Sequence, residues 1–166
     1  MWLDADSALC HLDRLLAAAR ALTGNHADAD DLVQDVYLGL LRRPRRLSRG
    51  SEVAYLMTML RNAQIDRFRA AARRQSVPLD EAEEPEDPRG GLRPDRAAEQ
   101  REVLDAVHAL VSPFRETVVA VDVLGLSYKE AGSALGVPVG TVMSRLARGR
   151  ERVIASLDSL PEAARG

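Results

Sequence analysis

The sequence predicts an all-α fold made of two small helical bundle domains joined by a flexible acidic linker. Hydrophobic residues make up 46% of the 166 residues and aromatic residues only 4%, which favours helices with aliphatic cores over sheets. Apolar residues recur at helical spacing on both sides of residues 76–96. That stretch is acidic, proline-rich and poor in apolar residues, so it cannot bury enough surface to fold. The expected domains are therefore residues 1–75 and 97–166.

Three helices are expected before the linker. The first spans about residues 7–22 and ends at the turn residues 23–25. The second spans about residues 28–43, begins with acids that suit the helix dipole, and stops at Pro44. The third spans about residues 52–74. Their predicted apolar faces comprise Leu9, Leu12, Leu15, Leu16 and Ala19, then Leu32, Val33, Val36, Tyr37, Leu40 and Leu41, and then Val53, Leu56, Met57, Leu60, Ile65 and Phe68.

Helices resume near Asp95, after the linker. Ser112 is expected to cap a helix that has Pro113 at its first position and reaches about Val123. The apolar stripe predicted before that cap comprises Val103, Leu104, Val107 and Leu110.

The stretch GLSYKEAGSALGVPVGTVMSRLARGR, residues 125–150, predicts a helix-turn-helix. Ser127 and Glu130 match the S-x-x-E capping box, and Gly136 suits the turn between the helices. The last helix is expected over about residues 138–157. Its predicted inward face comprises Val142, Leu146, Val153, Ile154 and Leu157.

The net charge of −2 conceals a strong pattern along the chain. Residues 42–74 hold ten arginines against Glu52 and Asp66, which gives +8. The flanking stretches, residues 1–41 and 75–102, each carry −5. Because arginine forks suit phosphates, the basic block indicates a polyanionic partner. The alternative is a solvated helix face.

The residues offer little support for catalysis. Cys10 is the single cysteine, which excludes an intrachain disulfide and a cysteine-rich metal site. The acids beside His26 lie at a helix start and lack the second histidine of a metal motif. No nucleophile elbow or phosphate-binding glycine loop is present. We therefore expect a protein that is not an enzyme and that needs no cofactor or metal. The N-terminus lacks the bases of a signal peptide and no apolar run reaches the ~18 residues of a membrane span, so a cytoplasmic location is expected.

Two surfaces suit nucleic acid. In the last helix, Thr141, Ser144, Arg145 and Arg148 provide short polar groups and arginines that can reach base edges and phosphates. The alternative is an ordinary helical hairpin. In the third helix, Tyr55 and Phe68 accompany Arg61 and Asn62, and aromatics beside arginines suit stacking of unpaired bases. For each aromatic, core packing is the alternative.

Three stretches carry a resemblance to a known family. They are ALTGNHADADDLVQDVYLGLL, YLMTMLRNAQIDRFR and SPFRETVVAVDVLGLSYKEAGSALGVPVGTVMSRLARGRERV. Together they resemble an extracytoplasmic function (ECF) RNA polymerase sigma factor of the sigma-70 family, over about residues 8–74 and 98–157. The resemblance implies that residues 1–75 are sigma region 2 and that residues 97–166 are sigma region 4. It implies an alternative sigma factor that directs core RNA polymerase to promoter DNA.

The resemblance also implies roles for particular residues. Core polymerase would be bound by Asp30, Asp31, Gln34 and Asp35. The −10 promoter element would be read and opened by Leu47, Ser48, Arg49, Tyr55, Arg61, Asn62, Asp66 and Arg67. The −35 element would be read by Thr141, Ser144, Arg145 and Arg148. The chain departs from the family at Tyr55, where tryptophan is usual, and at Met143, where lysine or arginine is common.

Two DNA-binding domains joined by a flexible linker suit a promoter with two separated elements. Elements centred about 23 base pairs apart lie roughly 78 Å apart, at ~3.4 Å per base pair. DNA would repel the acidic linker and attract the two DNA-binding domains. We expect a chain that is monomeric when free and held by an anti-sigma factor, in a stress response. The alternatives are a sigma-like decoy that binds an anti-sigma factor, and a conventional LuxR-like regulator that binds palindromic sites as a dimer.

Overall fold

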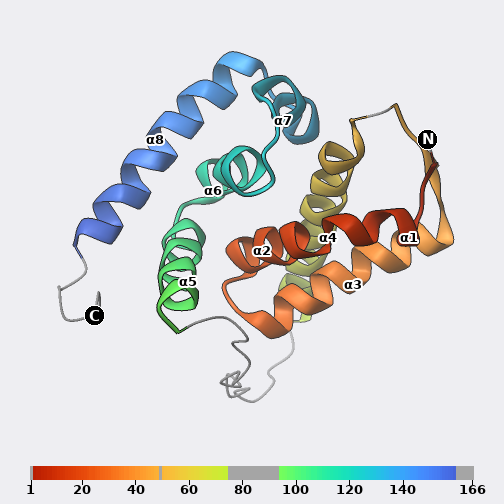
Figure 1. Ribbon diagram of the computed structural model, residues 1–166, viewed down its shortest axis with the longest axis horizontal. Helices are drawn as coiled ribbons and strands as arrows, with labels where there is room; N and C mark the ends of the chain where they lie inside the picture. The colour runs from red at the N-terminus through yellow and green to blue at the C-terminus, as the bar shows by residue number, and fades with distance from the viewer. Residues whose placement is uncertain (1, 49, 75–93, 160–166) are drawn as a thin grey trace.

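The computed structural model describes residues 2–48, 50–74 and 94–159 and confirms the all-α fold. The first half contains β1 (Trp2–Leu3), α1 (Ala5–Ala8), η1 (Leu9–His11), α2 (Leu12–Thr23), α3 (His26–Arg42), β2 (Arg45–Arg46) and α4 (Glu52–Arg74). The second half contains α5 (Pro94–His108), α6 (Ser112–Val118), the π-helical turn η2 (Val119–Val123), α7 (Tyr128–Leu135) and α8 (Val139–Asp158) (Figure 1). The linker predicted over residues 76–96 lies mostly outside the described residues.

The predicted first helix is divided into three short segments. Asp4 caps α1 by accepting a hydrogen bond from the Ser7 amide at 2.8 Å, and η1 then winds as a 3-10 turn before α2 begins. Because a 3-10 turn rotates side chains differently from an α-helix, Leu9 faces solvent. The prediction of Leu9 as a core residue was wrong.

Local capping chemistry sets the sharp turn between α2 and α3. Gly24 ends α2 with a φ of 85°, in the left-handed region that glycine adopts without a Cβ clash. Asn25 then caps α3 by accepting from the Asp28 amide at 2.8 Å. The helix ends at Arg42, one residue before the predicted end and two residues before Pro44.

Apolar periodicity assigned four side chains to the core that the structure leaves exposed. Leu41 is 66% exposed in the last turn of α3, and Phe68 is 64% exposed on α4. Val103 and Ile154 are exposed as well. Ile154 lies beyond Gly149, the last buried residue of α8. These four residues are corrections to the predicted core.

A small two-stranded sheet pairs β1 with β2 in the first half. Trp2 pairs with Arg46 and Leu3 with Arg45 in antiparallel register. Leu3 is fully buried, so the chain start is anchored against the segment that follows α3. The sequence analysis treated that segment as loop only.

The helix-turn-helix has the predicted local chemistry. Ser127 and Glu130 form a reciprocal capping box, and Gly136 ends α7 with a φ of 68°. A Cβ on Gly132 would lie 2.8 Å from the carbonyl oxygen of Val137, so the turn requires a glycine there. The predicted serine cap of α6 was wrong: Val111 occupies the cap position, and the Ser112 hydroxyl donates to Glu116 at 2.9 Å.

The two halves share one hydrophobic core. Buried side chains of α2, α3 and α4 join those of η2, α7 and α8 in a single cluster. Across the junction, α2 contacts α5 and η2, and α4 contacts α7. In Figure 1 the second half lies along the side of the first. The division into two domains, at residues 75 and 97, stays a prediction.

Candidate nucleic-acid and polymerase interfaces

The four residues predicted to bind polymerase lie on the exposed surface of α3. Asp30, Asp31, Gln34 and Asp35 are all exposed, because the opposite side of the helix packs its apolar residues into the core. Leu38, one turn after Asp35, is also exposed. The surface therefore combines three carboxylates with an apolar side chain, which suits a basic partner with an apolar contact.

The predicted −10 residues of α4 fall into two groups. Asn62 and Asp66 are exposed and line a groove of about 620 Å³ between α3 and α4, together with Leu38 and Asp35. Tyr55 is half-buried and packs against the core. Tyr55 therefore combines core packing with partial exposure.

Two predicted DNA-binding arginines of α4 already hold carboxylates. The Nε and Nη2 atoms of Arg67 both lie 2.9 Å from the Oδ2 atom of Asp35 on α3. The Nε atom of Arg61 donates to the Oε2 atom of Glu116 on α6 at 3.0 Å. A guanidinium has five N–H donors, so a carboxylate partner occupies part of this capacity and fixes the orientation of the side chain.

The loop before α4 is held by local hydrogen bonds. The hydroxyl and amide of Ser51 donate to the carbonyl oxygen of Ser48 at 2.7 and 3.2 Å. Leu47 is half-buried and Ser48 is exposed. Arg49, also predicted to contact the −10 element, lies outside the described residues. Gly50 has a φ of 84°, which favours glycine at this bend.

The predicted −35 residues share the outward side of α8. Ser144 and Arg148 are exposed, and Thr141 and Arg145 are half-buried. The Ser144 hydroxyl donates to the Thr141 carbonyl oxygen at 3.1 Å, and its oxygen remains able to accept a hydrogen bond. The helix has no side-chain cap at Pro138, so the amides of Val139 and Gly140 lack a side-chain acceptor, whereas the Thr141 amide donates to the Pro138 carbonyl oxygen at 3.0 Å.

Three contacts fix α8 against the rest of the second half. Arg150 donates to both carboxylate oxygens of Asp122 at 2.5 and 3.0 Å. These hydrogen bonds raise the pKa of Arg150. Gly149 faces Val118 so closely that a Cβ would lie 2.7 Å from it, and the guanidinium of Arg152 stacks 4.3 Å from the Phe114 ring centre. The sequence analysis did not identify these positioning residues.

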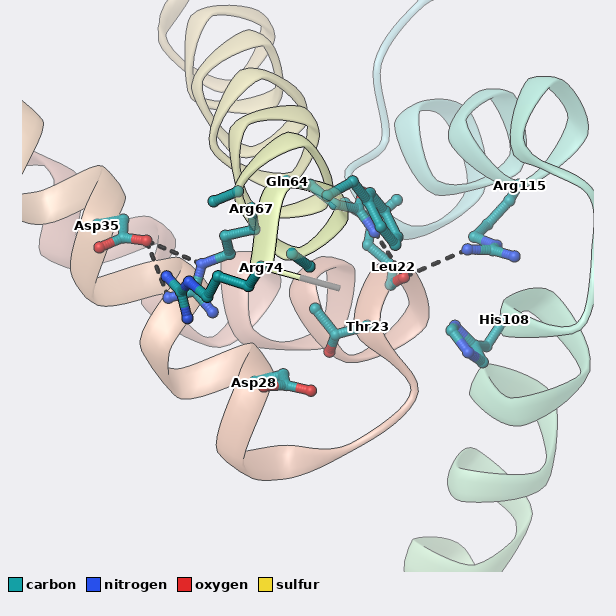
Figure 2. A pocket seen from close by; sticks show the side chains of 12 residues that line it. Leu22, Thr23, Asp28, Asp35, Gln64, Arg67, Arg74, His108 and Arg115 are labelled. Atoms are coloured by element: carbon teal, nitrogen blue, oxygen red, sulfur yellow. Dashed lines mark hydrogen bonds and ion pairs between the residues drawn. The ribbon is translucent and has the colours of Figure 1, made fainter. Parts of the chain in front are cut away.

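A cavity of about 860 Å³ lies at the junction of α2, α4 and α5 (Figure 2). Gln64 donates to the Leu22 carbonyl oxygen at 2.8 Å, and Arg115 from α6 donates to the same oxygen at 3.4 Å. Burial lowers the pKa of Arg115, whose guanidinium also donates to the Leu110 carbonyl oxygen at 2.7 Å. Phe68 lines this cavity, so its ring is accessible rather than packed in the core.

Chemistry typical of a metal site is not seen in the described part of the chain. Among those residues, no cluster of three or more histidine, cysteine or acidic side chains could hold a metal ion. Nor does any described helix combine the length and the apolar composition that crossing a membrane requires.

Comparison with known families agrees with the order of these surfaces. Residues 8–74 match the model of sigma-70 region 2, and residues 100–153 match the model of sigma-70 region 4. The ECF RNA polymerase sigma factor EcfG of Rhodopseudomonas palustris is 33% identical over 92% of this chain and 83% of its own length. The chain belongs to the ECF sigma factor family.

Other relatives are also RNA polymerase sigma factors. SigE of Mycolicibacterium smegmatis is 34% identical over 86% of this chain, although the matched part spans only 57% of the SigE length. CarQ of Myxococcus xanthus, an RNA polymerase sigma factor, is 31% identical over 90% of this chain and 86% of its own length.

Two solved structures share the fold. RpoE of Bartonella quintana, in complex with the anti-sigma factor NepR, has a TM-score of 0.70 and 27% identity, over 94% of this chain and 97% of that chain. CnrH, in complex with the cytosolic domain of CnrY, has a TM-score of 0.61 and 26% identity, over 94% of this chain and 88% of that chain. This ECF sigma factor therefore has the helical architecture of structures solved with protein partners.

Sequence reasoning missed the polar contacts between the halves. Glu116, Arg115 and His108 were not singled out, because their partners are distant in the sequence and no local pattern marks them. The isolated His108 and the S-P-x-x-E arrangement of Ser112 and Glu116 were the only available signals.

Proposed function

We propose that this chain is an alternative sigma factor that binds core RNA polymerase and directs it to promoters by recognising −10 and −35 elements. The observation that carries the proposal is the combination of three surfaces in one chain, in the order of the family. These are the acidic face of α3, the polar groove beside α4, and the outward side of α8. The chain supplies binding and specificity, without catalytic residues or a cofactor of its own.

The acidic face of α3 binds core polymerase in this proposal. Asp30, Asp31, Gln34 and Asp35 offer acceptors to a basic partner, and the exposed Leu38 adds apolar area that a partner can cover. A cytoplasmic location follows from this partner.

The −10 element is opened beside α4 in this proposal. Asn62 presents amide donors and an acceptor to base edges, and Phe68 presents an exposed ring on which an unpaired base can stack. Such stacking contributes about 1–3 kcal/mol per base. Extruding a base costs a few kcal/mol, so several contacts of this kind are needed to offset it.

The −35 element is read by α8 in this proposal. Its outward side carries Thr141, Ser144, Arg145 and Arg148, and η2 and α6 hold the helix rigidly through Asp122 and Val118. Rigid presentation matters because base readout requires side chains to be held in one geometry.

An anti-sigma factor is the proposed regulatory partner, and the free chain is proposed to be a monomer. The support is the fold shared with two sigma factors, one solved with the anti-sigma factor NepR and one with the cytosolic domain of CnrY. A sigma-like decoy and a LuxR-like dimeric regulator are the competing proposals. The exposed −10 groove beside α4 disfavours both, since neither needs to hold unpaired bases.

Transcription in vitro tests the proposal. Fragmented genomic DNA of the source organism would be transcribed by purified core RNA polymerase with and without the chain, and the RNA 5′ ends would be sequenced. We expect new start sites that share a two-block upstream motif. If folded chain and active core yield no new starts, the decoy or the conventional regulator is the better account.

A further inference from the structure

Two rows of exposed residues run side by side along the first half of α8. The apolar row comprises Val139, Met143 and Ala147. The polar row comprises Gly140, Ser144 and Arg148. Because helical residues four apart lie on one face, each row presents its side chains in one direction. Val139 is 42% exposed and Met143 is 53% exposed, so the apolar row faces solvent although the opposite side of α8 packs into the core.

The surroundings of the apolar row suit a polyanion. Residues 139–150 contain three arginines and no acid. Two of these, Arg145 and Arg148, form no ion pair within the described part of the chain. A Cβ on Gly140 would meet no atom within 4 Å, so the surface between the rows is open to a close approach. The apolar row is therefore continuous with the surface proposed to bind the −35 element.

The chemistry of the apolar row limits which base it can contact favourably. In the major groove, every base edge presents hydrogen-bond donors or acceptors, and thymine alone adds an apolar group, its C5-methyl. The thioether of Met143 and the isopropyl group of Val139 donate no hydrogen bond. Covering a polar base edge with them leaves that edge without a partner, which is unfavourable. Covering a methyl group removes apolar area from water, which is favourable.

The spacing of the apolar row matches neighbouring base pairs. Val139 and Met143 are four residues apart, which is about 6 Å along a helix axis at ~1.5 Å per residue. Base pairs follow one another at ~3.4 Å, so the two side chains span about two steps of the duplex. The unbranched Met143 side chain can also adjust its rotamer to reach a methyl group.

We propose that Met143, assisted by Val139, selects thymine in the −35 element through contact with its C5-methyl group. This inference rests on the proposed function and adds to it a base preference and the residue that sets it. Ser144 and Arg148 form hydrogen bonds to neighbouring base edges or phosphates, while the apolar row distinguishes thymine from the other bases at one or two positions.

Selection from duplexes with a randomised block tests the preference. The full chain selects duplexes in the presence of core polymerase and, in parallel, alone at low salt. The unchanged chain is compared with Met143→Ala, Met143→Arg and the control Ile154→Ala, which removes an equally apolar, exposed side chain farther along α8. Met143 is exposed, so its loss leaves no cavity, and thermal unfolding verifies that each variant folds.

The unchanged chain and Ile154→Ala should enrich thymine at the same position of the selected motif. Met143→Ala should lose most of this enrichment, and Met143→Arg should replace thymine by guanine, whose O6 and N7 atoms accept from a guanidinium. Identical motifs for all four chains would overturn the inference. So would an equal loss of affinity for every sequence in Met143→Ala, which would assign the apolar row to a protein partner.

Removal of the methyl group alone gives the sharper measurement. The selected thymine is replaced by uracil, which keeps every hydrogen-bonding group of the base. The unchanged chain should bind this duplex about fourfold more weakly, as exposure of one methyl group implies, and Met143→Ala should bind both duplexes equally. If uracil weakens binding to the same extent in both chains, or in neither, the methyl contact is refuted.

The two conditions separate this inference from the proposed function. A chain that selects thymine through Met143 but supports no promoter-specific transcription with core contradicts the proposed function alone. A chain that supports such transcription with a sequence preference indifferent to Met143 contradicts the methyl contact alone. A chain that selects no sequence under either condition contradicts both.

Discussion

Arginine side chains in this protein differ in whether they already bind other groups of the chain. Arg61, Arg67 and Arg150 hold carboxylates at 3.0 Å or less, and Arg115 donates to main-chain carbonyl oxygens. Arg148 is exposed on the outward side of α8. A composition count treats these arginines alike, whereas their partners indicate which of them are already fixed in orientation.

Arg148→Ala should weaken recognition of the −35 element. We expect a loss of about 1–3 kcal/mol on the preferred promoter if Arg148 makes a bidentate base contact, with relaxed preference at one base pair. The measurement is promoter binding by the chain with core polymerase, over a set of single-base −35 variants. Arg101→Ala, which removes an exposed arginine of α5 away from α8, is the control. A uniform loss over all sequences would instead assign Arg148 to a phosphate.

Asn62→Ala should reduce opening of the promoter. Asn62 is exposed in the groove beside α4, so its loss removes contacts to unpaired bases while the polymerase-binding face of α3 is unchanged. The measurement is permanganate footprinting of the open complex, with core affinity determined in parallel. Gln100→Ala, an exposed amide on α5, is the control. Equal open-complex yield in the Asn62 variant argues against this role.

At the scale of elements, the sequence predicted the bounds of several helices well. The bounds of α4 match the predicted residues 52–74, and the Gly24 and Gly136 ends match as well. The errors follow from regular periodicity applied to irregular segments. A 3-10 turn rotated Leu9 outward, and α8 continued past its last buried residue. Strands β1 and β2 have two residues each, too few to show a period.

The capping box of α7 makes the stability of the helix-turn-helix depend on pH in the acidic range. Hydrogen bonds from the Ser127 side chain and backbone lower the pKa of Glu130 below its usual value. The ionised carboxylate therefore stabilises the fold above the unfolded-state pKa, and this contribution is lost as the pH falls through the folded-state pKa.

Ser127→Ala should lower the free energy of unfolding by about 0.5–2 kcal/mol at neutral pH, because the α7 amide loses its cap. The difference from the unchanged chain should shrink as the solution is acidified below the usual pKa of a glutamate. Thermal unfolding of the full chain over a pH series measures it. Glu151→Ala on α8 is the control, and pH curves that stay parallel for Ser127→Ala would show that the box does not titrate.

At the scale of the whole molecule, the sequence predicted the content of each half but not how the halves meet. The basic block, the acidic linker and the helix-turn-helix are continuous stretches, which a reading along the chain detects. The junction depends on pairs such as Arg61 with Glu116 and Arg20 with Asp105. Their members lie far apart in the sequence and carry no periodic signal, so only the folded arrangement identifies them.

Ion pairs within the chain also explain why a chain with a strongly basic segment should bind DNA weakly by itself. Part of the positive charge in residues 42–74 is already held by Asp35 and Glu116, and the acidic stretches on either side oppose a polyanion. Promoter binding should therefore depend on core polymerase.

The most direct test of this account is the affinity of the chain for a promoter duplex, measured with and without core RNA polymerase over a series of salt concentrations. The account predicts weak, salt-sensitive binding by the free chain and tight, sequence-specific binding in the presence of core. Nanomolar, salt-resistant binding of the free chain to the same duplex would contradict it.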